Sequence, residues 1–136
     1  MHQAAVRDSA LYASFAENLE AYICKAKEMG MTPYALAVSD WYEAPRVLEI
    51  NVDRWTGKVG EIIRVKAGDN VMVASVLLVI RDAQGQIQEM GEAVQSGAGS
   101  AWWNYTIQSP IELTPFPSVQ AIAFDLPGNR ASFTIS

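Results

Sequence analysis

The spacing of apolar residues changes its period once along this chain, close to Pro45. Before that proline, apolar residues recur every three or four positions, which is the period of an amphipathic helix. After it they alternate with polar residues, which is the period of a β-strand with one buried face. The sequence therefore predicts two parts, a helical N-terminal extension over residues 1–45 and a β domain over residues 46–136.

The first part predicts one main helix over about residues 9–29. Its apolar stripe consists of Leu11, Phe15, Leu19, Tyr22, Ile23, Ala26 and Met29. Gly30 suits the left-handed position that ends a helix. Thr32 followed by Pro33 is typical of a new helix start, so we expect a second, short helix that ends near Ser39. We interpret the stripe as packing surface.

Seven runs with a two-residue period follow Pro45. Turn-forming residues separate them and no helical pattern interrupts them, which favours an antiparallel sandwich over parallel β-α-β units. The predicted strands cover about residues 47–53, 63–67, 71–81, 87–93, 103–107, 119–124 and 131–135. We expect a mainly β fold, a seven-stranded antiparallel sandwich with one or two N-terminal helices packed on it.

Four short motifs give the β domain a family likeness. They are Asp82-x-x-Gly85, Gly91-x-Ala93, Trp103-x-Tyr105 and Ala123-x-Asp125-x-x-Gly128-Asn129. With these motifs in this order, residues 46–136 resemble the bacterial immunoglobulin-like domains found as repeats in surface and adhesin-type proteins. The helical extension lies outside the resemblance. The resemblance implies an immunoglobulin-like fold without enzymatic activity, and it implies no particular ligand because this fold carries many functions.

The third and sixth runs are apolar on both faces, although a sandwich strand needs only one apolar face. In an immunoglobulin topology these two strands are neighbours. Their outward side chains then form one apolar patch of Leu77, Val79, Ile122 and Phe124. We predict that the main helix covers this patch and that the protein is then a monomer. The alternative is a homo-oligomer that associates through the patch.

The stock of reactive side chains limits the possible chemistry. His2 is the only histidine and Cys24 the only cysteine, so a histidine-based catalytic triad, a Cys/His zinc site and an internal disulfide are excluded. The net charge of −5 disfavours nucleic acid and anionic membranes as partners. No apolar stretch is long enough to span a membrane. No signal peptide is visible, so we expect a cytoplasmic protein, or an exported one if the chain is part of a longer protein.

Tryptophans supply the candidate ligand-binding residues. Trp102 and Trp103 are adjacent and therefore face opposite ways on a strand, with Trp103 and Tyr105 directed into the core. Trp102 then faces outward beside Asn104, and Trp55 lies in a turn where it is expected to be exposed as well. Exposed tryptophan flanked by amides is typical of a sugar or peptide platform. We favour a second interpretation, in which the N-terminal extension covers Trp102.

Two predicted loops carry hard oxygen ligands. Asp69 and Asn70 lie between the second and third strands, and Asp125 and Asn129 lie between the sixth and seventh. An immunoglobulin topology places both loops at one end of the sandwich, where these side chains could bind calcium. Turn formation explains the same residues without a metal. We therefore interpret them as turn residues and predict neither a metal nor a cofactor.

Three functions are open at this stage. The one that we favour is a non-catalytic structural or protein-interaction module that presents loops or an edge strand to a partner protein. The alternative is a carbohydrate-binding module that uses Trp102 and Trp55. The third is an enzyme that uses Asp40 and Glu43 beside Trp41, although a helix exit explains these residues equally well. The accessibility of the tryptophans separates the first two.

Overall fold

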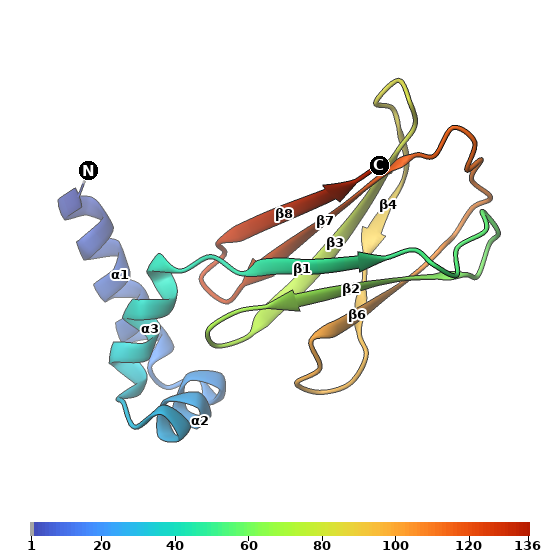
Figure 1. Ribbon diagram of the computed structural model, residues 1–136. Coiled ribbons are helices and arrows are strands. Elements are labelled where there is room, and N and C mark those ends of the chain that lie inside the picture. The colour runs from blue at the N-terminus through green and yellow to red at the C-terminus, as the bar shows by residue number, and fades with distance from the viewer. Residues whose placement is uncertain (1) are drawn as a thin grey trace.

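The computed structural model describes residues 2–136, with side chains described from residue 8 onward. Within that range three helices precede eight strands. They are α1 (His2–Ala16), α2 (Glu20–Met29), α3 (Pro33–Tyr42), β1 (Arg46–Asn51), β2 (Ile62–Gly68), β3 (Val73–Arg81), β4 (Ile87–Glu92), β5 (Val94–Gln95), β6 (Trp102–Thr106), β7 (Ser118–Asp125) and β8 (Arg130–Ile135). The helices lie together beyond one end of the strands (Figure 1).

The strands form two antiparallel four-stranded sheets, β1-β2-β6-β5 and β4-β3-β7-β8. Ile63 and Val65 of the first sheet and Leu78 and Ile80 of the second are fully buried in one common core. The alternation of polar and apolar residues after Pro45 therefore does produce a β-sandwich. β3 and β7 are neighbours, as predicted for the third and sixth runs.

The sandwich has eight strands in place of the predicted seven because a short further strand follows the predicted fourth run and belongs to the other sheet. β4 pairs with β3, and the Ala93 backbone N–H still donates to the Val76 carbonyl at 2.9 Å. The next residue, Val94, already lies opposite Asn104 of β6 in the other sheet. The predicted fourth run, residues 87–93, thus corresponds to β4, and β5 is an additional strand that directly follows it, while each of the other six runs becomes one strand.

The helix predicted over residues 9–29 is also divided. α1 ends at Ala16 and α2 begins at Glu20, and between them lies Asn18, a residue with low helix propensity. The later boundaries agree better with the prediction. Gly30 ends α2 with a φ of 69°, and the Thr32 hydroxyl caps α3 by accepting a hydrogen bond from the Ala35 backbone at 3.1 Å. α3 continues past Ser39 to Tyr42.

The helices pack on one another through small side chains. Their buried apolar residues are Ala13, Ala16, Tyr22, Ala26, Leu36 and Ala37, and these form a core separate from that of the sandwich. Of the predicted stripe only Tyr22 and Ala26 are buried, whereas Phe15 is 76% exposed and Leu11 is 65% exposed. The prediction selected the large apolar residues, but close helix packing uses the alanine face. Among the described residues, no helix is both long and apolar enough to cross a membrane.

The prediction that a helix covers the patch of Leu77, Val79, Ile122 and Phe124 is wrong. The helices lie beyond the end of the sandwich and not over a sheet (Figure 1). Val79 is nevertheless only 3% exposed, and the other three residues are half-buried. Val79 lies opposite Met90 and Gln120 on the two adjacent strands, so long side chains of the same sheet shield it.

Candidate functional site

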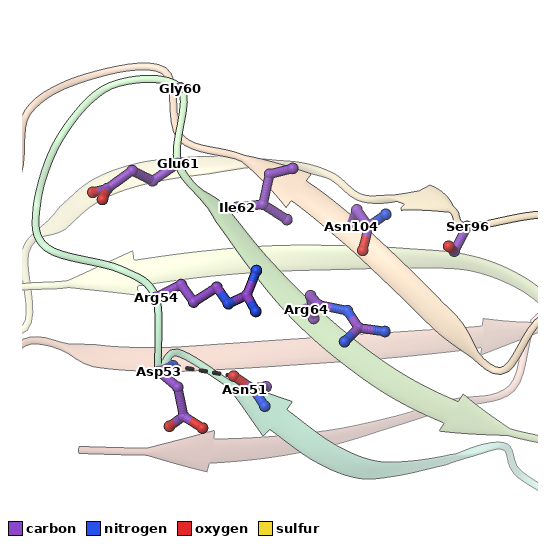
Figure 2. Close-up of a pocket in the computed structure, with 9 residues that line it drawn as sticks. All are labelled: Asn51, Asp53, Arg54, Gly60, Glu61, Ile62, Arg64, Ser96 and Asn104. Carbon is purple, nitrogen blue, oxygen red and sulfur yellow. Dashed lines mark hydrogen bonds between the residues drawn. The ribbon is translucent and has the colours of Figure 1, made fainter.

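A groove of about 730 Å³ opens on the outer face of the β1-β2-β6-β5 sheet (Figure 2). We call it the arginine groove. It is lined by Asn51, Asp53, Arg54, Gly60, Glu61, Ile62, Arg64, Ser96 and Asn104. The lining is mainly polar, and it combines residues from three strands with residues from the loop between β1 and β2 and with Ser96 of the loop between β5 and β6.

Strand alternation places the central residues of the groove. On β2, Ile63 and Val65 point into the core, so Arg64 between them points outward. The register places Arg64 between Asn51 of β1 and Asn104 of β6. A cation with an amide on each side therefore stands on the outer face of the sheet.

The loop between β1 and β2 forms one wall of the groove and is held by its own hydrogen bonds. The Glu61 carboxylate accepts hydrogen bonds from the backbone of Thr56 at 2.9 Å and of Lys58 at 2.8 Å, and from the Thr56 hydroxyl at 2.8 Å. The hydrogen bonds from Thr56 and Lys58 lower the pKa of Glu61. The Glu61 charge is thus engaged with its own loop.

Two arginines in the groove lack a carboxylate partner. Arg54 and Arg64 are exposed and form no ion pair with any described residue. The Arg64 guanidinium carbon lies 4.3 Å from the ring centroid of Trp102, and Lys66 Nζ lies 5.9 Å from the same ring. Figure 2 shows the Asp53 carboxylate pointing away from both guanidinium groups. Cation–π contact restrains Arg64 but leaves its charge uncompensated.

The tryptophans lie only partly where the sequence predicts. Trp103 and Tyr105 are buried and Trp102 is half-buried on the outer face, as expected. The side chains found against the Trp102 ring come from β2 and not from the N-terminal helices. Trp55 is buried, so the prediction that it is exposed is wrong. It packs edge-on against Phe116, with ring centroids 5.9 Å apart, and no local pattern reveals so distant a neighbour.

A second site lies where the end of α3, the β2–β3 loop and the end of β7 meet. One carboxylate oxygen from each of Asp40, Asp69 and Asp125 lies within 4.8 Å of the other two. We call this group the aspartate cluster. Asp40 is 0% exposed and Asp125 is 3% exposed. The two predicted loops thus meet at one end of the sandwich, and the helical part adds a third carboxylate.

Hydrogen bonds use only some of the carboxylate oxygens. Asp40 Oδ2 accepts from the Tyr22 hydroxyl at 2.6 Å, and Tyr22 in turn is hydrogen-bonded to Tyr12. Asp69 Oδ2 accepts from the Val71 backbone at 3.2 Å. The Oδ1 atoms of Asp40 and Asp69 are buried and accept no hydrogen bond from the described residues. The Oδ1 atom of the neighbouring Asn70 is in the same state.

Asn129 joins the cluster to the helices. Its backbone N–H donates to Asp125 Oδ1 at 2.7 Å, and its Nδ2 lies 3.1 Å from Asp125 Oδ2. The same Nδ2 lies 3.0 Å from the Trp41 carbonyl and 3.3 Å from the carbonyls of Asp40 and Glu43. This residue, which the sequence predicts as a turn former and calcium candidate, therefore acts as a donor at the exit of α3.

The cluster carries strong negative potential. Burial raises the pKa of Asp40, and the nearby charges of Asp69 and Asp125 raise it further, against the opposing effect of the Tyr22 hydrogen bond. Burial also raises the pKa of Asp125, although hydrogen bonds from Asn129 oppose the change. The charged forms of Asp40 and Asp125 are thus destabilised.

Sequence reasoning missed the arginines and the position of Asp40. Alternation along β2 is enough to place Arg64 outward, but its amide neighbours depend on strand register, which one sequence does not specify. The sequence suggests Asp40 and Glu43 together as candidate catalytic residues. The structure separates their environments, since Asp40 is buried in the cluster and Glu43 is exposed.

Comparison with known proteins gives limited likeness. No protein-family model matches the chain, and no curated protein matches it. An engineered protein of known structure is 20% identical, with a TM-score of 0.45, over 66% of this chain and 18% of that chain. CopC from Methylosinus trichosporium OB3b is 11% identical, with a TM-score of 0.45, over 66% of this chain and 87% of that one. The chain spans about a fifth of the engineered protein. At these TM-scores neither comparison assigns a family or a function.

Proposed function

We propose that this chain is a non-catalytic, immunoglobulin-like binding module whose arginine groove takes an acidic segment of a partner protein. The observation that carries the proposal is the pair of unpaired arginines, Arg54 and Arg64, in one groove of a chain with a net charge of −5. Asp53 and Glu61 give the lining a formal charge of zero, so the proposal rests on the placement of the two arginines and not on a net positive charge. The Asp53 carboxylate points away from both guanidinium groups and Glu61 is hydrogen-bonded to its own loop, which leaves Arg54 and Arg64 available to an acidic partner.

The sheet order supports the immunoglobulin-like part of the proposal. The order β1-β2-β6-β5 corresponds to strands A-B-E-D of an immunoglobulin domain, and β4-β3-β7-β8 corresponds to C′-C-F-G. The passage from β4 to β5 is then the place where the chain leaves one sheet for the other. The groove lies on the outer face of the A-B-E-D sheet.

The groove offers the groups that an acidic peptide requires. A guanidinium group binds a carboxylate through two parallel hydrogen bonds, and Trp102 limits the motion of Arg64 beforehand. Asn51 and Asn104 flank Arg64 and can bond to peptide backbone groups.

The alternative of a carbohydrate-binding module has less support. A sugar platform needs an open aromatic face. Trp55 is buried, and the Arg64 guanidinium lies over the ring of Trp102. A sugar that stacked on that side of Trp102 would have to displace Arg64.

The test is a binding titration with a fluorescein-labelled peptide of alternating glutamate and glycine, followed by fluorescence anisotropy. We expect binding at low ionic strength that weakens as salt is added, because the interaction is between exposed charges. Arg64→Gln should weaken binding about tenfold, since a charge-assisted hydrogen bond contributes about 1.5–3 kcal/mol. Arg54→Gln should act in the same direction.

Arg130→Gln is the matched control, because Arg130 is an exposed strand arginine of the opposite sheet. It should bind the peptide as the unmodified chain does. An equal loss in Arg64→Gln and Arg130→Gln would show general charge attraction and would overturn the assignment to the groove. Binding of a neutral cello-oligosaccharide without binding of the acidic peptide would favour the carbohydrate alternative.

A further inference from the structure

We propose that the aspartate cluster binds a calcium ion that joins the end of α3 to the sandwich. The proposal rests on the meeting of Asp40, Asp69 and Asp125, whose oxygens lie within 4.8 Å of one another, together with the complete burial of Asp40. It is independent of the arginine groove, which lies on the outer face of one sheet.

Unused oxygens point to a ligand. Asp40 Oδ1, Asp69 Oδ1 and Asn70 Oδ1 are all buried and receive no hydrogen bond from the described residues. A buried polar atom without a partner is destabilising, and a buried charge without a counter-charge is more so. One cation bound by the cluster would supply a partner for the two of these atoms that belong to it, Asp40 Oδ1 and Asp69 Oδ1.

The charge of the cluster points the same way. Lys25 with Glu28 is the ion pair found among the described residues, and it lies on α2, so no lysine or arginine neutralises the cluster through such a pair. Glu89 shows how this fold accommodates a buried carboxylate otherwise. Its oxygens accept hydrogen bonds from Tyr105 at 2.5 Å, from Ser109 at 2.7 and 3.0 Å, and from Gln108 at 2.8 Å. The Oδ1 atoms of Asp40 and Asp69 have no comparable donors among the described residues.

The ligand chemistry selects the metal. The available atoms are carboxylate and amide oxygens, which suit hard cations and not the softer metals that prefer nitrogen or sulfur. The ligands come from a helix end, a loop and a strand end. Calcium accepts such irregular sets of oxygen ligands, whereas magnesium requires near-octahedral geometry and retains several waters. Calcium is therefore the ion to which the proposal commits.

The first experiment measures metal binding to the full chain with terbium, a luminescent calcium substitute. Trp41 is adjacent to Asp40 in sequence and Tyr22 is hydrogen-bonded to it, so both can transfer excitation energy to a bound terbium ion. We expect sensitised luminescence that calcium removes and that an equal concentration of magnesium leaves largely in place. Asp69→Asn should weaken terbium binding by roughly tenfold or more, because affinity follows the charge of the ligands.

Asp53→Asn is the matched control, because Asp53 is an exposed aspartate outside the cluster. It should keep the luminescence of the unmodified chain. Equal signals from Asp69→Asn and the unmodified chain would overturn the proposal. So would a signal lost equally in Asp53→Asn and Asp69→Asn.

The second experiment separates a calcium ion from a shared proton, which is the other way to relieve the repulsion. In EDTA, Asp69→Asn should unfold at the same temperature as the unmodified chain or at a higher one, because it removes one of the repelling charges. With calcium, the Tm of the unmodified chain should rise by several degrees, and at the same calcium concentration that of Asp69→Asn should rise clearly less. If calcium leaves the Tm of the unmodified chain unchanged, the cluster shares a proton and the proposal is wrong. Asp125→Asn provides a second variant should Asp69→Asn not fold.

Discussion

Two buried carboxylates in this protein have opposite surroundings. Glu89 is 8% exposed and is surrounded by donors, whereas Asp40 is fully buried and has one oxygen without a donor. Burial alone would raise the pKa of Glu89, but the hydrogen bonds from Tyr105, Gln108 and Ser109 outweigh it and lower the pKa. The number of hydrogen-bond donors around each carboxylate, and not its burial, decides whether its charged form is stable.

This contrast gives a prediction for Glu89. Glu89→Gln should lower the free energy of unfolding by about 1.5–3 kcal/mol, because an amide has one acceptor oxygen where the carboxylate has two. The folded-state pKa lies below the ordinary value of 4.5, so the stabilisation by Glu89 is complete above that pH and is lost as the pH falls through the folded pKa. Urea unfolding of both proteins over a pH series measures this. A difference that grows on acidification would contradict it.

At the level of elements, the sequence identifies the strands better than their partners. Alternation after Pro45 located every main strand, because a half-buried strand must show it. The strand β5 was not predictable, since it has only two residues and its pairing with β6 depends on contacts between residues distant in the sequence. The prediction of the buried helix face was wrong for a related reason. The buried face is set by the close approach of α1 and α3 through alanines, and a single sequence does not specify that approach.

The close contact between Gly91 of β4 and the ring of Tyr105 can be tested by substitution. A Cβ at this position would lie 2.9 Å from Cε1 of Tyr105, whose hydroxyl is bonded to Glu89. The ring is buried and cannot move aside easily, because the β6 backbone fixes one end and the hydrogen bond to Glu89 fixes the hydroxyl. Gly91→Ala should therefore destabilise the protein by about 1–3 kcal/mol through overpacking. Gly97→Ala is the control, because nothing lies within 4 Å of the added carbon. Equal thermal unfolding of the two variants would show that the contact is not restrictive.

For the molecule as a whole, the two cores are separate. The helical core and the sandwich core share no buried residue, and the helical core meets the β domain through Val71 and Leu126. The sequence predicts a division of the chain at Pro45. It did not predict the placement of the helices at the end of the sandwich, because the cluster that joins the two parts draws on residues far apart in the chain.

This separation predicts that a fragment of residues 44–136 folds by itself. It should give a β-type circular dichroism spectrum and unfold cooperatively, because its core is complete without the helices. Its free energy of unfolding should be lower than that of the full chain, since Val71 and Leu126 become more exposed. A fragment without cooperative unfolding would show that the sandwich requires the helices.

The position of Asn129 affects how the two parts respond to force. Its amide nitrogen lies near three carbonyl oxygens at the exit of α3, while its backbone is anchored to Asp125. Tilting the helical part against the sandwich must first strain these bonds. The turn between β7 and β8 is therefore a mechanical link between the helices and the sandwich. We expect a force applied to the helices to strain the hydrogen bonds of Asn129 before it disrupts either hydrophobic core.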